Sequence, residues 1–175
     1  MKKLLVVVDM QNDFVDGALG TPEAQAIVPN VISKIQSWDG DIFCTRDTHS
    51  NDYLSTREGK YLPVIHCVEG TDGHKINKKV FEELCKHSRH MTTLNKYTFG
   101  STALPEIIRP LNYDYVELIG LCTDICVVSN AIILKAHFPE IDIAVDASCC
   151  AGVTPESHKA ALATMKMCQI NIIGE

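Results

Sequence analysis

The sequence predicts one α/β domain over residues 1–175, in which a six-stranded, mostly parallel sheet is covered by helices on both faces. Short aliphatic runs alternate along the chain with segments whose apolar residues recur at helical spacing. Aliphatic runs without polar alternation are typical of strands buried on both faces, as in parallel sheets. A length of 175 residues suits one domain and is short for two. The pattern therefore favours a doubly wound fold.

Three strands are expected in the first half of the chain. Residues 3–8 form a continuous aliphatic run that stops at Asp9, and residues 41–46 form a second run. Residues 91–96 form a third strand with a weaker pattern.

Two helices are expected between these strands. Residues 28–38 carry apolar side chains at helical spacing, with Asn30 as the cap. Residues 75–87 show the same spacing. Residues 48–74 lack clear periodicity and hold three of the seven histidines. Long irregular segments within compact domains are often functional.

The second half continues the alternation. Strands are expected over 115–121, 141–145 and 169–173. Helices are expected over 101–111, 123–137 and 155–167.

Composition excludes several classes of function. The net charge is −6 with both signs interspersed, whereas nucleic-acid binding is marked by a basic stripe. No apolar run approaches the ~20 residues of a membrane span, and no signal peptide precedes the first strand. We therefore expect a soluble cytoplasmic protein with no nucleic-acid or membrane partner.

Eight cysteines without an export signal favour reduced thiols over disulfides. Five lie among apolar neighbours and are expected to be buried free thiols: Cys44, Cys67, Cys85, Cys149 and Cys168.

Reactive or polar residues follow four of the predicted strands. Asp9, Asp47, Lys96 and the segment 122–126 each come just after a strand ends. Because ligands of doubly wound sheets bind outside the carboxyl ends of the strands, we expect these residues to share one site.

Cys126 is the candidate nucleophile, one turn into the predicted helix 123–137. A helix N-terminus lowers the pKa of a thiol, and its unpaired N–H groups can stabilise an oxyanion. The alternative is a buried structural cysteine.

Asp9 and Lys96 are its candidate partners. A carboxylate after an aliphatic strand is partly desolvated, which raises its pKa and suits proton transfer, although a turn-capping role is the alternative. Lys96 can hold developing negative charge or keep Asp9 ionised, and its alternative is a surface lysine.

Three stretches together carry a family resemblance: residues 8–14, Lys96 with 99–102, and 120–127. The later Asp146-Ala147 and 156–158 also fit. The chain resembles the isochorismatase-like cysteine hydrolases, and within them the nicotinamidase branch. The resemblance implies an Asp9–Lys96–Cys126 triad and a cis peptide bond before Cys122. It also implies an oxyanion hole made by the backbone N–H groups of Cys122 and Cys126.

The resemblance also implies a metal site. Asp47, His49 and His66 match the metal ligands of the nicotinamidase branch, and Glu58 is the candidate fourth ligand. Two imidazoles and a carboxylate suit zinc, which we prefer, or iron or manganese. Such a Lewis acid can bind the pyridine nitrogen of nicotinamide.

Three residues are expected to wall the substrate ring: Phe14, Leu62 and Phe99. Their alternative is a role as core residues.

The predicted activity is therefore hydrolysis of nicotinamide to nicotinate and ammonia through a thioester on Cys126. The rivals are a related carbamoyl or ureido amidohydrolase without a working metal site, an isochorismatase proper, and a non-catalytic α/β binding module. The absence of Gly-x-Gly-x-x-Gly after the first strand disfavours a dinucleotide-binding module. Family resemblance suggests a homo-oligomer.

Overall fold

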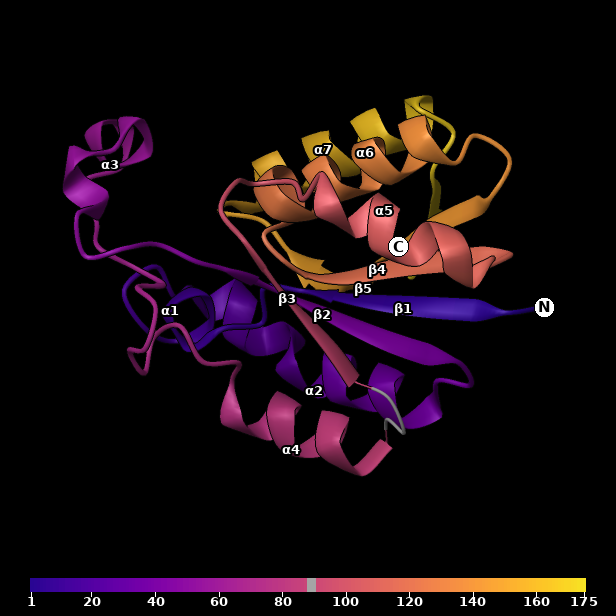
Figure 1. Ribbon diagram of the computed structural model, residues 1–175, viewed down its shortest axis with the longest axis horizontal. Helices are drawn as coiled ribbons and strands as arrows, with labels where there is room; N and C mark the ends of the chain where they lie inside the picture. The colour runs from indigo at the N-terminus through magenta and orange to yellow at the C-terminus, as the bar shows by residue number, and fades with distance from the viewer. Residues whose placement is uncertain (88–90) are drawn as a thin grey trace.

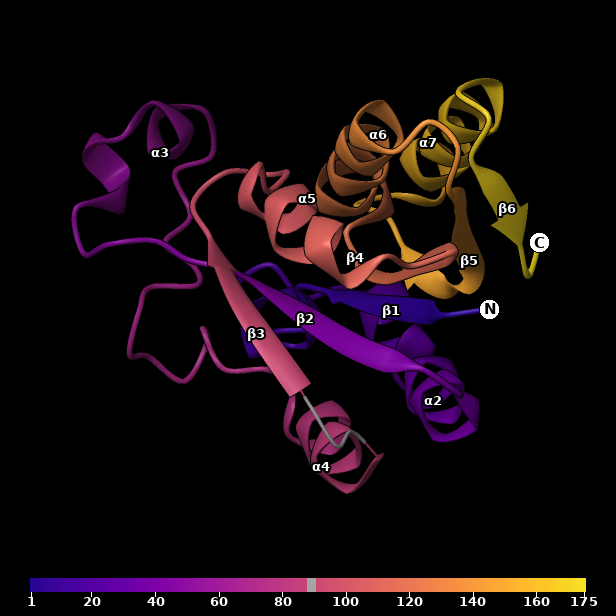
Figure 2. The same ribbon diagram turned by 45° about the vertical axis from the view of Figure 1, so that its right-hand side comes forward.

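The computed structural model describes residues 1–87 and 91–175, and its centre is one sheet of six parallel strands. The strands lie in the order β3-β2-β1-β4-β5-β6 (Figure 2). Their bounds are Lys3–Val8 (β1), Asp41–Asp47 (β2), Met91–Lys96 (β3), Tyr115–Leu121 (β4), Asp142–Ala151 (β5) and Asn171–Ile173 (β6). The predicted fold class is confirmed, and every pairing in the sheet is parallel.

Helices cover both faces of the sheet (Figure 1). One face carries α5 (Ala103–Ile108), α6 (Val128–His137) and α7 (Pro155–Met167), and the other carries α2 (Pro22–Ser37) and α4 (Lys78–His87). Along β1, alternate side chains enter two separate apolar cores, with Leu4 in one and Leu5 in the other. This two-sided burial explains why β1 reads as an unbroken aliphatic run.

The strand order places a topological switch between β1 and β4, which is where doubly wound sheets bind ligands. β4 approaches β1 closely here. Gly120 has φ 118°, and a Cβ on it would lie 2.1 Å from the Val8 carbonyl oxygen, so only glycine fits. The peptide bond between Leu121 and Cys122 is cis, as the resemblance implied.

The segment expected to be irregular contains short helices. The 3₁₀ turn η1 (Tyr53–Ser55) and α3 (Arg57–Tyr61) project from the body beyond the carboxyl ends of the strands (Figures 1 and 2). A bridge between His49 and Val68 closes the base of this arm. A further short helix, α1 (Asn12–Val15), follows β1.

Several predicted boundaries are wrong. The first long helix begins at Pro22, because the Thr21 side chain accepts a hydrogen bond from the Ala24 N–H, and Asn30 lies within the helix instead of capping it. β5 extends to Ala151, since a register shift in its pairing with β4 lets pairing resume at Cys150.

The other boundaries differ less. The predicted helix 75–87 begins at Lys78, and 101–111 divides into α5 and the 3₁₀ turn η2 (Arg109–Leu111). The predicted helix 123–137 starts as one π-helical turn, η3 (Thr123–Val127), before α6.

Two of the five cysteines expected to be buried are exposed. Cys85 lies on α4 and Cys168 at the end of α7, both facing solvent, whereas Cys44, Cys67 and Cys149 are buried. Within the described residues, no helix is both long and apolar enough to cross a bilayer.

Candidate active site

Asp9 lies directly after β1, fully buried, with a left-handed backbone at φ 47°. The Thr45 hydroxyl donates a hydrogen bond to Asp9 Oδ1 at 2.7 Å. Asp9 Oδ2 forms an ion pair with Lys96 Nζ, also at 2.7 Å. The carboxylate is therefore held from both sides.

Lys96 is the centre of the cluster. Its ammonium lies 2.7 Å from Asp9 Oδ2, 3.1 Å from Asp47 Oδ1 and 3.4 Å from Cys126 Sγ. The side chain is 1% exposed, so solvent screens these contacts little. The structure thus brings together the three residues predicted as a triad and joins them to Asp47.

Burial and neighbouring charges shift the pKa values of all three groups in this cluster. It raises the pKa of Asp9, and the Lys96 charge opposes that rise only in part. Burial would lower the pKa of Lys96, but the Asp9, Cys126 and Asp47 charges raise it above its usual range. Burial, with Asp9 nearby, also raises the pKa of the Cys126 thiol well above its usual range. The lowered thiol pKa expected from the helix N-terminus is therefore wrong, and the resting thiol needs a base.

The turn that carries Cys126 is fixed by a buried amide. Asn130 donates to the Cys126 carbonyl at 2.8 Å and to the Phe99 carbonyl at 3.3 Å. Its Oδ1 accepts from the Ser101 N–H at 2.9 Å. Cys122 and Cys126 line the same cavity, the location that the predicted oxyanion hole requires.

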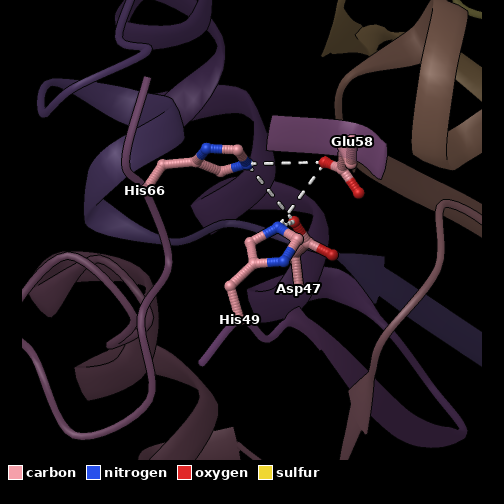
Figure 3. Close-up of side chains that lie close together, drawn as sticks. All are labelled: Asp47, His49, Glu58 and His66. Carbon is pink, nitrogen blue, oxygen red and sulfur yellow. Dashed lines mark ion pairs between the residues drawn. The ribbon is translucent and has the colours of Figure 1, made fainter. Parts of the chain in front are cut away.

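A second cluster adjoins the first. Asp47, His49, Glu58 and His66 each offer one ligand atom, and these atoms lie within 4.8 Å of one another (Figure 3). His49 Nε2 is 3.0 Å from Asp47 Oδ2 and 3.6 Å from Glu58 Oε1. His66 Nε2 is 3.6 Å and 3.9 Å from the same two atoms.

The donor set fits a divalent metal ion. His66 Nδ1 lies 2.7 Å from the Val64 carbonyl, which can only accept, so Nδ1 carries the proton and the Nε2 lone pair faces the cluster. His49 Nε2 is buried and makes no hydrogen bond despite its nearness to Asp47. Two imidazoles with two carboxylates suit zinc, iron or manganese.

Asp47 is shared between the clusters. Its Oδ2 faces the two histidines, and its Oδ1 accepts from Lys96. Burial would raise its pKa, but His49, His66 and Lys96 together lower it far below the usual range. The carboxylate is ionised and available to both neighbours.

Residues of both clusters line one cavity of about 210 Å³: Cys126 from the first, and Asp47, Glu58 and His66 from the second. Its walls are largely apolar and include the predicted ring residues Phe14, Leu62 and Phe99. Phe14 is buried and lies 5.6 Å from the His66 ring, between ring centroids. Leu62 and Phe99 are 38% and 46% exposed and border the opening.

Sequence reasoning missed several residues of this site. Leu19, Thr21, Ala24, Ile125, Gly152 and Val153 also line the cavity. Ile125 lies inside the stretch 120–127 that carried the resemblance, and no sequence signal marks the other five. Gln11 and Asp13 lie inside the stretch 8–14 that carried the resemblance, yet no role followed from the motif alone.

The fold and site define a doubly wound α/β protein with an Asp–Lys–Cys cluster beside a histidine–carboxylate group. The isochorismatase domain family matches residues 3–174, so the chain belongs to this family and the predicted resemblance is confirmed.

Relatives span the whole chain. An isochorismatase family protein of Bacillus subtilis, PncA, is 28% identical over 173 residues, covering 93% of each sequence. The crystal structure of nicotinamidase/pyrazinamidase PncA from B. subtilis is 27% identical and matches with a TM-score of 0.85 over 99% of this chain and 100% of that one. The structure of Pyrococcus horikoshii pyrazinamidase in complex with zinc is 27% identical, with a TM-score of 0.84 over all of both chains.

Proposed function

We propose that this protein is a nicotinamidase, which hydrolyses nicotinamide to nicotinate and ammonia. One observation carries the proposal: the Lys96–Asp47 ion pair joins a buried Asp9–Lys96–Cys126 cluster to a metal-type cluster, and residues of both clusters line one largely apolar cavity. Similarity to the nicotinamidase/pyrazinamidase of B. subtilis and the zinc-bound pyrazinamidase of P. horikoshii supports it.

The first step is activation of the thiol. Burial raises the pKa of Asp9, which makes its carboxylate a stronger base toward the Cys126 thiol, whose own pKa burial also raises. Lys96, at 3.4 Å from Sγ, stabilises the thiolate as it forms.

The thiolate then attacks the amide carbon, and a C–S bond forms as the carbonyl π electrons move to oxygen. The backbone N–H groups of Cys122 and Cys126 hold this oxyanion. Asp9 returns its proton to the amide nitrogen, the C–N bond breaks and ammonia leaves.

Water completes the cycle. Asp9 takes a proton from the water as the oxygen attacks the thioester carbon, and the C–S bond breaks. The thiolate regains its proton from Asp9, and the carboxylic acid that forms passes its own proton to solvent and leaves as nicotinate.

Asp47, His49, Glu58 and His66 would hold the divalent ion, with zinc preferred. When bound there, the ion supplies a Lewis acid for a pyridine nitrogen, which favours a ring amide over a ureido substrate.

Ammonia release from nicotinamide tests the proposal, measured for purified protein with and without chelator. We expect turnover that chelation abolishes and that added zinc restores. Turnover of a ureido compound but not of nicotinamide would instead assign the protein to a related amidohydrolase.

A further inference from the structure

Residues 10–13, which follow Asp9, contact the segment that carries the candidate metal ligands, residues 47–77. The contacts lie at the start, the middle and the end of that segment. Gln11, Asp13 and the backbone between Met10 and Asp13 make these contacts. None of these groups belongs to the triad or to the four candidate metal ligands.

The Gln11 side chain forms hydrogen bonds to the backbone at the start of the ligand segment. The side chain is fully buried, and its Oε1 accepts from the Asp47 N–H at 2.7 Å. Its Nε2 donates to the Asp47 carbonyl at 2.8 Å and to the His74 carbonyl at 3.0 Å. Both N–H donors of this amide and one acceptor position of its oxygen thus bind the backbone of Asp47 and of His74.

The Asp13 carboxylate accepts a hydrogen bond from the backbone in the middle of the segment. Its Oδ2 accepts from the Cys67 N–H at 2.8 Å, next to His66. Cys67 has a left-handed backbone at φ 46°, a conformation that costs free energy and persists only when neighbours hold it. The Cys67 carbonyl in turn accepts from the His49 N–H at 3.0 Å, which connects the second histidine to the same anchor.

The end of the segment is paired to the same stretch through the backbone. Asp13 N–H donates to the Gly73 carbonyl at 3.1 Å, and Asn77 N–H donates to the Met10 carbonyl at 2.7 Å. Gln11 and Ile76 form an antiparallel bridge. Glu58 is the exception, because it lies on the projecting arm, away from these contacts.

We propose that Gln11 and Asp13 are positioning residues that hold Asp47, His49 and His66 in the geometry of the metal site. The Asp9 motif then has two roles: Asp9 serves the thiol, and the next four residues shape the metal site. This inference rests on the proposed metal centre.

Zinc affinity is the direct test. The metal-free protein is titrated with zinc against a chromophoric chelator for wild type, Gln11→Met and Asp13→Ala. Loss of groups that support metal ligands weakens affinity by about 10–100-fold, and we expect this range for each variant. Saturating zinc should restore most of the amide turnover, because the triad is intact. Asp13→Ala keeps the test decisive if Gln11→Met fails to fold.

Two control variants separate positioning from general destabilisation. Glu117→Gln weakens the buried ion pair between Glu117 Oε1 and Lys34 Nζ, 2.7 Å apart on the opposite side of the sheet centre from β2. It should lower the melting temperature without changing zinc affinity. Asn130→Asp disturbs the support of Cys126 and should lower turnover without rescue by zinc.

The outcomes are distinguishable. Wild type that binds no zinc would overturn both the metal centre and the positioning role of Gln11 and Asp13. Wild type that binds zinc, with Gln11→Met and Asp13→Ala binding equally tightly, would overturn the positioning role alone and leave the proposed activity standing. Affinity lost equally in Glu117→Gln would also overturn it.

Discussion

The two halves of the site are built by different means. The thiol half draws Asp9, Lys96 and Cys126 from the ends of β1, β3 and β4, and each side chain is 4% exposed or less. The metal half draws His49, Glu58 and His66 from a segment with little regular structure.

The difference concerns how each half is held. Parallel strand ends bring the triad together through the backbone ladder of the sheet. In place of a continuous ladder, the metal segment has the isolated bridges His49–Val68 and Gln11–Ile76, and side-chain contacts to Gln11 and Asp13 add to them. The thiol half should therefore tolerate loss of the metal, whereas the metal half should respond to single supporting substitutions.

Removing the nucleophile should give the largest effect. Cys126→Ala deletes the thiol, and loss of a catalytic nucleophile lowers turnover by about 10⁴- to 10⁶-fold. Zinc affinity should stay unchanged, because Sγ lies outside the ligand group. Ammonia release and zinc titration measure the two effects. A Cys126→Ala variant with full turnover would refute the thiolate mechanism.

Removing a metal ligand should impair the metal half far more than the thiol half, the reverse of the effect of Cys126→Ala. His66→Ala deletes an Nε2 donor, so zinc affinity should fall by more than the ~100-fold expected for loss of a supporting group. The rate of Cys126 alkylation by a small neutral reagent should change much less than the zinc affinity, because His66 is linked to Sγ only through Asp47 and Lys96. A large change in that rate would show that the halves are not independent.

Asp9, in the thiol half, should set the acid limb of the pH profile of turnover. Burial raises the pKa of Asp9, and a base works only when deprotonated, so turnover should decline at a higher pH than the ~3.9 of an ordinary aspartate. Thr45→Val removes a hydrogen bond that lowers this pKa. The limb should move up by about one pH unit, the equivalent of one hydrogen bond to a charged group.

The pH profile of kcat/KM with saturating zinc checks this prediction. An acid limb that shifts downward or does not move in Thr45→Val would mean that another group sets it.

Substitutions in the cavity walls should have the smallest effects. Phe14 is buried against the His66 ring, so Phe14→Leu should raise KM about tenfold, in the range for a methylene-scale change in an apolar pocket. Leu62→Ala and Phe99→Ala remove half-exposed side chains and should raise KM by no more than ~threefold. Initial-rate kinetics on nicotinamide decide the order, and a larger effect at Leu62 than at Phe14 would reverse the assigned geometry of the pocket.

Much of this architecture is visible in the sequence. Unbroken aliphatic runs indicate strands buried on both faces, and parallel strands share one carboxyl edge. Asp9, Asp47, Lys96 and Cys126 could therefore be placed at one site before the strand order was known. The residue types also predicted the metal-type group, because imidazole and carboxylate at family spacing restrict the chemistry.

Other features needed the tertiary structure. Asn30 looked like a helix cap, yet Thr21 takes that role because its hydroxyl meets the Ala24 N–H. Exposure of Cys85 and Cys168 follows from the outward faces of α4 and α7, which local composition did not distinguish. The thiol pKa was expected to fall with the helix terminus, but burial next to Asp9 outweighs that effect.

The sequence by itself determined the fold class and the shared strand edge, and it indicated the residues that we propose as reactive groups, because these depend on local periodicity and residue type. Only the tertiary structure decided that Lys96 joins both clusters, that Glu58 reaches the metal group from the projecting arm, and that Gln11 and Asp13 hold the ligand segment. The Gln11 contact with Asp47 spans 36 residues and the Asp13 contact with Cys67 spans 54. Such side-chain-to-backbone bonds have no periodicity, so they exist only once packing has brought distant segments together.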